Sequence, residues 1–318
     1  MNSLDSMAET IRPQLKDYRF DPFRGYPADR PDAWEGYFIS RLQGLLKDPL
    51  WTVFSSEPSD PLCVLACRVS PWDSDHFGFG MASIHVVFCP EQIGSEHHIA
   101  KLLNKCLEEL RRRDVRFVSA RIQGDQLQAL HGFEESGFRY FDNVIWPVVT
   151  TRDVDSEPGR GVRLMVESDL GRVVEIAENN CYGRGHFYCD RRFDRTVVNR
   201  MYGKWVRTAW GACDPIAVIE ESGQVQGFFL FGIDPTLSAA LGRKYGRMRL
   251  LAMDSAAQGK GQGKVLFRGA MSVMKSMGAD LIDSGYSTKN HASARIHARM
   301  GFHSAYEEVT LHLWLGPK

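Results

Sequence analysis

Residues 258–264 read Gln-Gly-Lys-Gly-Gln-Gly-Lys, and their composition and spacing are those of a loop that binds phosphate. The loop follows an apolar run at residues 248–253 that predicts a β-strand, and it precedes apolar residues at helical spacing over residues 265–277. A strand, a glycine-rich turn and a helix start direct several backbone N–H groups to one point, and such a nest binds anions. The glycines lack a Cβ atom, so a pyrophosphate group can approach the backbone closely.

Three known types of phosphate loop can be compared with this stretch. A P-loop requires Ser or Thr after its lysine, whereas Val265 follows Lys264, and a dinucleotide fingerprint requires the spacing Gly-x-Gly-x-x-Gly, which these glycines do not have. The third pattern, Gln/Arg-x-x-Gly-x-Gly/Ala, fits residues 258–263 at every position and resembles the acyl-CoA pyrophosphate loop of the GNAT superfamily of N-acetyltransferases. An ordinary glycine-rich loop is the alternative interpretation of this stretch alone.

The residues after the loop strengthen the resemblance. A second short strand is predicted at residues 281–286, Asn290 follows it, and Gly301 and Phe302 begin eleven residues after the asparagine. GNAT proteins have the same order of strand, asparagine, helix and Gly-Phe turn, and a last strand is predicted at residues 309–315. The resemblance covers roughly residues 160–318.

One position departs from the family pattern. The tyrosine that serves the family as general acid falls seven residues after the asparagine, and this chain has His297 there. A protonated imidazole could deliver a proton to a departing thiolate, since its unperturbed pKa near 6.5 suits proton transfer near neutral pH. The alternative is a histidine on a helix face with no catalytic role. Tyr286, at the end of the preceding strand, is the second candidate for the acid.

The resemblance implies acyl transfer from acetyl-CoA to an amine, by direct attack in a ternary complex. The strand before the loop would pair with the pantetheine arm, the N–H of Met253 would donate to the thioester carbonyl, and Asn290 would bind on the pantetheine or carbonyl side. No general base is visible, and no metal site is predicted. The residues expected to bind acetyl-CoA are Leu251, Ala252, Met253, Gln258, Gly259, Lys260, Gly261, Gln262, Gly263, Lys264 and Asn290.

The acceptor pocket is expected in the aromatic stretch that precedes the predicted helix at residues 196–209. GNAT proteins build this pocket between their first two helices, and an aromatic cluster that belongs to the core is the alternative. The residues predicted to line the pocket are His186, Phe187, Tyr188 and Asp190.

The N-terminal half resembles a degenerate copy of the same unit. A strand at residues 115–120 and a helix lead to Gly137 and Phe138, but no glycine loop precedes the upstream helix, so this half should not bind CoA. Residues 72–78, Trp-Asp-Ser-Asp-His-Phe-Gly, resemble a segment of bacterial TDP-fucosamine acetyltransferases, which also join a degenerate half to a GNAT half.

The predicted fold class is therefore α/β: a GNAT fold, with a mixed central sheet flanked by helices, and a degenerate GNAT-like N-terminal domain. Polar, turn-rich residues mark the best candidate linker. The predicted boundaries are an N-terminal extension at 1–45, a degenerate domain at 46–150, a linker at 151–160 and a catalytic domain at 161–318.

Composition limits the partners. Lys and Arg number 39 and Asp and Glu also number 39, so the chain lacks the basic excess of nucleic-acid-binding proteins. No apolar run reaches 18 residues and the first residues lack signal-peptide features, so we expect no membrane association. Seven scattered cysteines indicate reduced thiols and a cytoplasmic location. We also consider a homodimer.

Three functions stay open from the sequence. The first is acetylation of a small-molecule amine, with a nucleotide-linked amino sugar as the leading acceptor. The second is acetylation of a protein or an antibiotic. The third is a non-catalytic module that binds acyl-CoA, and the absence of the family tyrosine is its main support.

Overall fold

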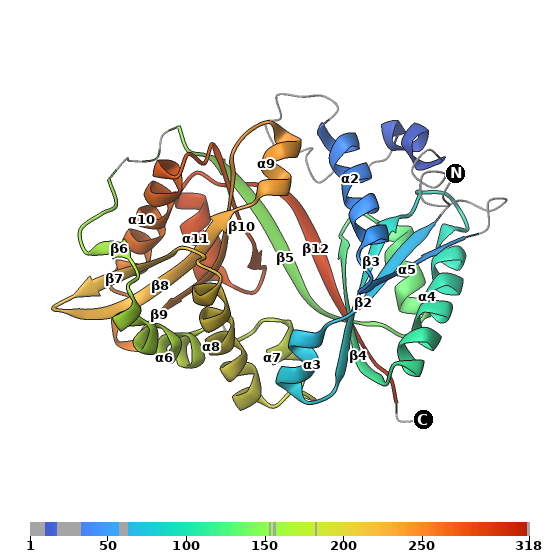
Figure 1. Cartoon of the computed structure of the whole chain (residues 1–318), viewed down its shortest axis with the longest axis horizontal. Coiled ribbons are helices and arrows are strands. Elements are labelled where there is room, and N and C mark those ends of the chain that lie inside the picture. Colours follow the sequence, from blue (N-terminus) through green and yellow to red (C-terminus); the bar gives the residue numbers. More distant parts are fainter. Residues whose placement is uncertain are drawn as a thin grey trace. The chain divides into compact units, whose positions relative to one another are not determined.

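The computed structural model describes residues 10–17, 33–56, 63–152, 154, 157–181 and 183–316 (Figure 1). The chain divides into two compact units, and each is described by itself. Unit 1 contains the described residues up to 144 together with 306–316, and unit 2 contains residues 145–305. Two strands, β5 (Arg139–Thr150) and β12 (His303–Trp314), contribute residues to both units. Of the predicted extension, residues 1–9 and 18–32 lie outside the described part, and so do residues 153, 155 and 156 of the predicted linker.

The strands of unit 1 form one sheet. Neighbouring strands pair antiparallel from β1 to β2 to β3 and from β4 to β12, whereas β3 and β4 are parallel. Besides β12 and the start of β5, these strands are β1 (Trp51–Ser55), β2 (Val64–Val69), β3 (Gly80–Phe88) and β4 (Val115–Gln123).

Both faces of this sheet have apolar cover. The helices α4 (Ser95–Arg112) and α5 (Leu127–Glu135) bury alternate residues of β2, β3 and β4 on one face. The short helix η1 (Arg12–Asp17) and α2 (Ala33–Lys47) form a smaller cluster with Val64 and Phe88, whereas α3 (Pro71–Phe77) is a single short helix.

The helix start of unit 1 differs from the loop at residues 258–264. Helix α4 is also preceded by a glycine of positive φ, Gly94, but the N–H of that glycine donates to the Glu96 side chain at 3.1 Å. The Glu96 carboxylate therefore satisfies an N–H group at the start of this helix and would repel an anion there.

The strands of unit 2 run from the end of β5 through β10, β9, β8 and β7 to β6. The pair β9–β10 is parallel, and the other neighbours are antiparallel. The strands are β6 (Val162–Leu164), β7 (Ile216–Glu221), β8 (Gln224–Ile233), β9 (Tyr245–Met253), β10 (Leu281–Ser284) and the short β11 (Tyr286–Ser287).

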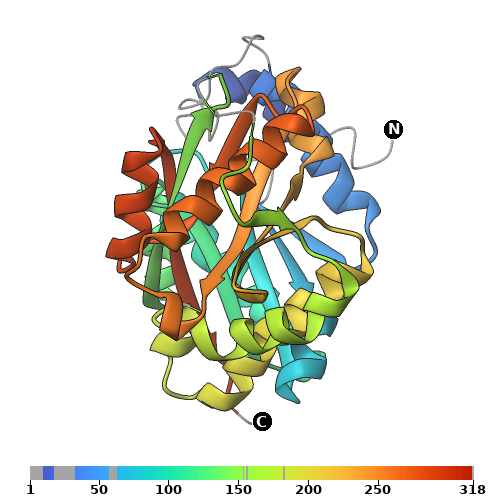
Figure 2. The same ribbon diagram turned by 90° about the vertical axis from the view of Figure 1, so that its left-hand side faces the viewer.

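Helices cover both faces of this sheet (Figure 2). On one face, α10 buries Phe229, Phe231 and Met248, and on the other α6 and α8 bury Phe228 and Leu230. The alternation of neighbouring residues between the faces is what a two-sided strand requires. The helices are η2 (Glu167–Asp169), α6 (Leu170–Asn180), α7 (His186–Cys189), α8 (Arg195–Gly211), α9 (Pro235–Leu241), η3 (Ser255–Ala257), α10 (Gln262–Ser276) and α11 (His291–Arg299).

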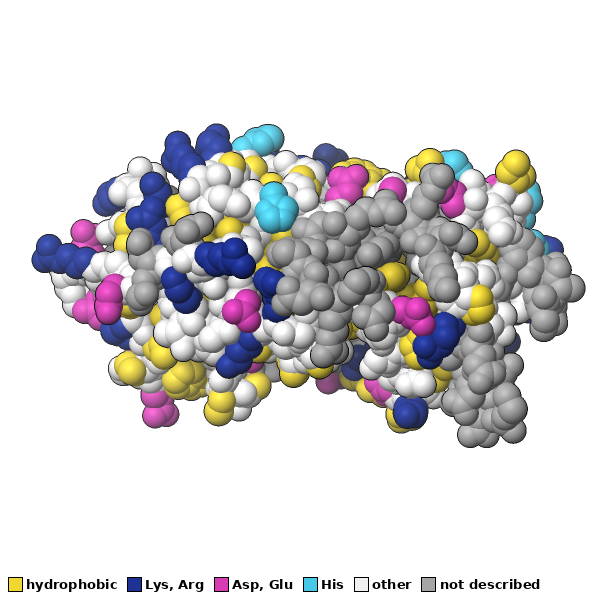
Figure 3. All heavy atoms as spheres, turned by 90° about the horizontal axis from the view of Figure 1, so that it is seen from above, with side chains coloured by type: hydrophobic (Ala, Val, Ile, Leu, Met, Phe, Trp, Pro, Cys, Tyr) yellow, Lys and Arg dark blue, Asp and Glu magenta, His cyan; other side chains and the backbone are white. Residues whose placement is uncertain are grey.

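The surface mixes charges of both signs, as the equal counts of acidic and basic residues predict. On the face in Figure 3, Lys and Arg side chains are scattered among acidic, polar and apolar side chains. No helix in the described part of the chain combines the length and the apolar character that a membrane span requires.

Candidate active site

The glycine-rich loop connects β9 to α10. Asp254 ends the strand and accepts a hydrogen bond from the N–H of Ala256, which caps η3. Two glycines then have left-handed backbone conformations, Gly259 with φ of 77° and Gly261 with φ of 82°. A residue with a Cβ atom is strained at these angles, so glycine at these positions lets the chain turn into the helix.

The turn leaves a row of backbone donors unused. The N–H groups of Lys264 and Val265 donate to the Gly261 carbonyl, but those from Gly259 to Gly263 donate to no described residue. The side-chain amide of Gln258 donates to the Met253 carbonyl at 3.1 Å and ties the loop to the strand. With Lys260 and Lys264 exposed beside it, this row can bind a diphosphate.

One edge of β9 has no partner strand among the described residues next to this loop. The ladder with β10 runs from Tyr245 to Met248 and stops there, while the ladder with β8 continues to Met253. The N–H of Asp254 donates to the Gln226 carbonyl on the β8 side. Because donors alternate along an antiparallel ladder, the N–H groups of Leu251 and Met253 point to the open edge.

Asn290 caps helix α11 and is also available to a ligand. Its side-chain oxygen accepts from the N–H of Ser293 at 3.1 Å, which satisfies the helix start. Its amide NH₂ group makes no hydrogen bond with a described residue. Asn290 can therefore hold the helix and donate to a ligand at once.

His297 is buried, with 3% of its surface exposed. Its Nδ1 lies 2.8 Å from the Ser293 carbonyl, which assigns the ring proton to Nδ1. Its Nε2 meets no described residue at hydrogen-bonding geometry, although the backbone of Ser284 lies near enough to the ring to favour its protonated form. Burial lowers the pKa of His297 to about 4, so the ring is neutral at pH 7. In this tautomer a neutral imidazole presents an acceptor at Nε2 and no proton.

Tyr286 lies against His297, and its hydroxyl differs from the imidazole Nε2 in that it carries a proton. The phenol is half-buried, and burial raises its pKa, so the hydroxyl keeps its proton at neutral pH. It makes no hydrogen bond with a described residue. Its chain neighbour Gly285 allows close packing, because a Cβ atom there would lie 3.0 Å from the ring of Trp146.

The residues predicted for the acceptor pocket lie together: His186, Phe187 and Tyr188 are on the short helix α7, and Asp190 is its C-cap. The Tyr188 hydroxyl donates to Asn199 at 2.6 Å, and Asp190 is 2% exposed and accepts from Arg192. His186 packs on Phe187 with ring centroids 4.1 Å apart. These polar groups therefore hold the segment in shape.

A nearby link joins α7 to the segment before α11. The Lys289 ammonium donates to the Cys189 sulfur at 3.7 Å. The segment that carries the predicted acceptor residues is thus tied to the segment that carries Asn290 and His297.

The sequence analysis did not predict an ion pair between the neighbouring strands β9 and β10. Arg247 and Asp283 are register partners on β9 and β10, one residue before the two strands separate. The carboxylate of Asp283 is fully buried and accepts from Arg247 at 2.8 Å, and the guanidinium lies 5.1 Å from the Trp146 ring centroid. Asp283, a charged residue inside the predicted strand at 281–286, was the feature of the sequence that could have indicated a buried ion pair.

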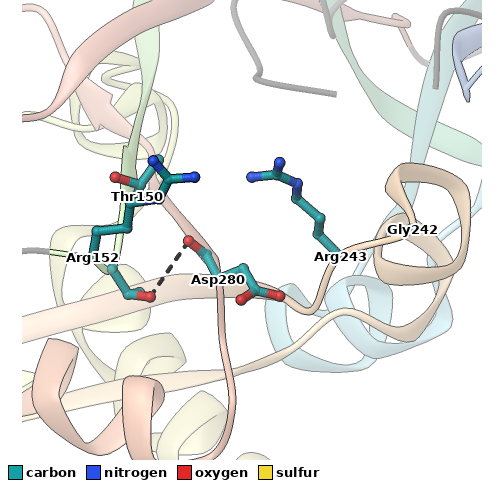
Figure 4. A pocket seen from close by; sticks show the side chains of 6 residues that line it. Thr150, Arg152, Gly242, Arg243 and Asp280 are labelled. Atoms are coloured by element: carbon teal, nitrogen blue, oxygen red, sulfur yellow. Dashed lines mark hydrogen bonds between the residues drawn. The ribbon is translucent and has the colours of Figure 1, made fainter. Parts of the chain in front are cut away.

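A separate pocket lies at the other end of these strands. Arg152 and Arg243 extend their guanidinium groups toward one another across it, above Asp280 (Figure 4). None of its lining residues is among the predicted site residues.

Comparison with known proteins agrees with this geometry. Residues 186–302 match the model of the acetyltransferase (GNAT) family. The chain is 27% identical over 141 residues to the L-methionine sulfoximine/L-methionine sulfone acetyltransferase of Salmonella typhimurium, an alignment that covers 44% of this chain and 78% of that protein.

Two solved structures show the same fold at low identity. A GCN5-related N-acetyltransferase from Sphaerobacter thermophilus superposes with a TM-score of 0.57 at 14% identity, over 85% of this chain and 97% of that one. A tandem GNAT protein from the clavulanic acid biosynthesis pathway superposes with a TM-score of 0.52 at 13% identity, over 98% and 96% of the two chains.

The fold and the family match define the class of the molecule as an acyltransferase. More particularly, residues 186–302 are similar to the acetyltransferase (GNAT) family, whose members use acetyl-CoA as the acetyl donor. The predicted GNAT fold with a second GNAT-like half is confirmed by these neighbours.

Proposed function

We propose that the protein transfers an acetyl group from acetyl-CoA to the primary amine of a small molecule. The proposal rests on the row of backbone N–H groups from Gly259 to Gly263, which donate to no described residue. This row lies beside the open edge of β9. The row fits the diphosphate of CoA, and the edge fits the amide groups of its pantetheine arm.

Different groups of the chain would bind different parts of acetyl-CoA. Backbone amides of the loop would bind the diphosphate, with Gln258 keeping the loop against Met253. Leu251 and Met253 would pair with the pantetheine amides, and the NH₂ group of Asn290 would bind on the pantetheine or carbonyl side. The Met253 N–H would also donate to the carbonyl oxygen as negative charge develops there.

The reaction is a direct attack in a ternary complex. The amine nitrogen forms a bond to the thioester carbon, the carbon–sulfur bond breaks, and the ammonium proton leaves to water. The thiolate takes a proton from a nearby acid. We assign that role to Tyr286, because its hydroxyl carries a proton at neutral pH and the neutral ring of His297 carries none at Nε2. His297 then positions the phenol ring.

Two classes of small amine are supported as the acceptor. The resemblance of residues 72–78 to TDP-fucosamine acetyltransferases favours a nucleotide-linked amino sugar. The similarity to a methionine sulfoximine acetyltransferase favours the α-amine of an amino acid analogue. In both cases the segment around α7 would form a wall of the pocket, with Tyr188 and Asp190 holding its shape through their hydrogen bonds.

A thiol-release assay with acetyl-CoA and a panel of amines tests the proposal. The panel contains TDP-amino sugars, methionine sulfoximine, aminoglycosides and lysine peptides. We expect amine-dependent thiol release with one of the first two classes. Turnover only with an aminoglycoside or a peptide would support antibiotic or protein acetylation instead. Binding of CoA without thiol release from any amine would support a non-catalytic acyl-CoA module.

A further inference from the structure

Unit 1 has a cluster of arginines on the sheet face opposite α4. Cross-strand partners share a face of a sheet, and the register Trp51–Arg68–Ser83–Ser119 runs across β1, β2, β3 and β4. The adjacent row Ala66–His85–Arg121 lies on the same face, two residues along each strand. Arg68 and Arg121 therefore flank small residues.

A third arginine reaches the cluster from helix α2. Arg41 lies 3.5 Å from the Nδ1 of His85, measured from its terminal nitrogen. The Trp51 ring is 4.8 Å from the His85 ring, and the Arg68 guanidinium lies 5.9 Å from the Trp51 centroid. Helix and sheet together place three guanidinium groups around one half-buried pair of rings.

These three arginines surround His85 without a counter-charge among the described residues. None of Arg41, Arg68 and Arg121 forms an ion pair with a described residue. In unit 2, by contrast, Arg163 pairs with Asp169 at 2.6 Å and Arg247 pairs with Asp283 at 2.8 Å. Like charges held close together repel, and a bound anion offsets that repulsion.

The pKa of His85 reflects its burial and the positive charges of the same three arginines. Burial, together with the charges of Arg41, Arg121 and Arg68, lowers the pKa of His85 to about 3. The hydroxyls of Ser83 and Ser119 make no hydrogen bond with a described residue. The floor between the arginines thus consists of small residues with hydroxyl groups available to a ligand.

We propose that this face of unit 1, formed by Arg41, Arg68, Ser83, Ser119 and Arg121 beside Trp51, binds the diphosphate of a nucleoside diphosphate or its derivative. Guanidinium groups bind phosphate oxygens in pairs, and two or more of them match the charge of a diphosphate. The Trp51 ring offers a surface on which the base stacks. The proposal does not rest on acetyl transfer by unit 2.

Calorimetry with UDP on the full-length wild-type protein and on the full-length Gly261→Glu variant, without CoA, tests this proposal. The variant adds a carboxylate to the glycine-rich loop, so UDP binding that persists in it does not come from that loop. We expect saturable binding of UDP, weaker binding of inorganic pyrophosphate, and a loss of about tenfold in affinity for each guanidinium removed in Arg68→Gln and Arg121→Gln. The matched control is Arg111→Gln, which removes one exposed charge from the end of α4 on the other face.

A second variant keeps the test valid if the arginine variants fail to fold. Ser83→Asp places a carboxylate between the arginines and should abolish UDP binding, whereas Ser83→Asn should retain it. The absence of saturable UDP binding to the wild-type protein, or equal affinity in the Arg68→Gln and Arg121→Gln double variant, would overturn the proposal. Equal affinity for pyrophosphate and UDP would overturn its nucleoside part.

Discussion

The imidazole of His297 packs against the phenol of Tyr286, with ring centroids 4.6 Å apart and planes tilted by 33°. Two further rings, Phe267 and Phe302, lie with their centroids 5.0 Å from that of the imidazole. The aromatic surroundings keep His297 uncharged, so the phenol is the member of the pair that carries a proton to donate. The arrangement makes His297 a positioning residue in our account.

Tyr286→Phe removes the proposed acid and leaves the ring in place. We expect turnover to fall by about 100-fold, because general acids contribute about that much or more. The affinity for CoA, measured by calorimetry, should stay unchanged. Tyr140→Phe removes an exposed hydroxyl in unit 1 and serves as the control. Unchanged turnover in the Tyr286 variant would exclude the phenol from the mechanism.

His297→Ala and His297→Phe separate packing from chemistry. The alanine variant leaves a cavity among three aromatic rings, so we expect a loss of about 3 kcal/mol in stability and lower turnover, with little change in CoA affinity. The phenylalanine variant preserves a ring and should keep most of the activity. If both variants lose turnover equally while remaining folded, the imidazole itself takes part in the reaction.

The buried histidine also predicts acid sensitivity. The folded protein holds the pKa of His297 at about 4, below its unfolded value near 6.5, so the unfolded state binds more protons between these values. Its contribution to stability is complete above pH 6.5 and is lost as the pH falls, by about 3 kcal/mol at pH 4. Urea unfolding at pH 7 and pH 4 should show this loss in the wild type and a smaller loss in His297→Phe. Equal losses would contradict the assignment.

Gly261→Glu tests the anion nest. The substitution adds negative charge beside the row of N–H groups, and we expect CoA binding to be lost. Gly94→Glu is a matched control, because Gly94 also stands at a helix start with positive φ, 95°, and also has no atom near its Cβ direction, but belongs to unit 1. Both variants should show similar strain, so only a selective loss of CoA binding supports the site.

Asp283→Asn tests the buried ion pair. Removing the Asp283 carboxylate leaves Arg247, which is 28% exposed, with Asp234 at 3.7 Å as its remaining counter-charge, and we expect a loss of about 1–3 kcal/mol in stability. Replacing both residues by leucine should recover much of that loss, because no buried charge then lacks a partner. Denaturant unfolding of the two variants measures the difference. A single variant as stable as the wild type would show that the pair is dispensable.

The fold of unit 2 was predictable because its signals are local. The hairpin expected at residues 216–231 appears as β7 and β8, and the helix expected at 196–209 appears as α8. Helix α9 was not predicted, since Pro235 and the short apolar stretch after it resemble a loop. The pairing of strands was harder to predict from the sequence. Residues 308–314 of β12 pair with β4 of unit 1, and hydrophobic periodicity does not identify a partner strand so distant in sequence. The predicted domain boundaries stay a prediction.

The turn into α10 was easier to predict than the state of the acid. The glycine pattern acts over a few residues, and Gly259 and Gly261 have left-handed angles that glycine adopts without strain. The state of His297 depends on rings from three separate segments, so its neutral form could not be predicted from spacing. The residues assigned to catalysis and binding remain proposals until the variants are measured.

The most direct test of the account is thiol release from acetyl-CoA with and without a small primary amine, measured side by side for the wild type and Gly261→Glu. We predict amine-dependent release by the wild type and none by the variant, with both proteins folded. Amine-dependent release at the same rate by both proteins would contradict the account, since acetyl transfer would then not depend on the glycine-rich loop.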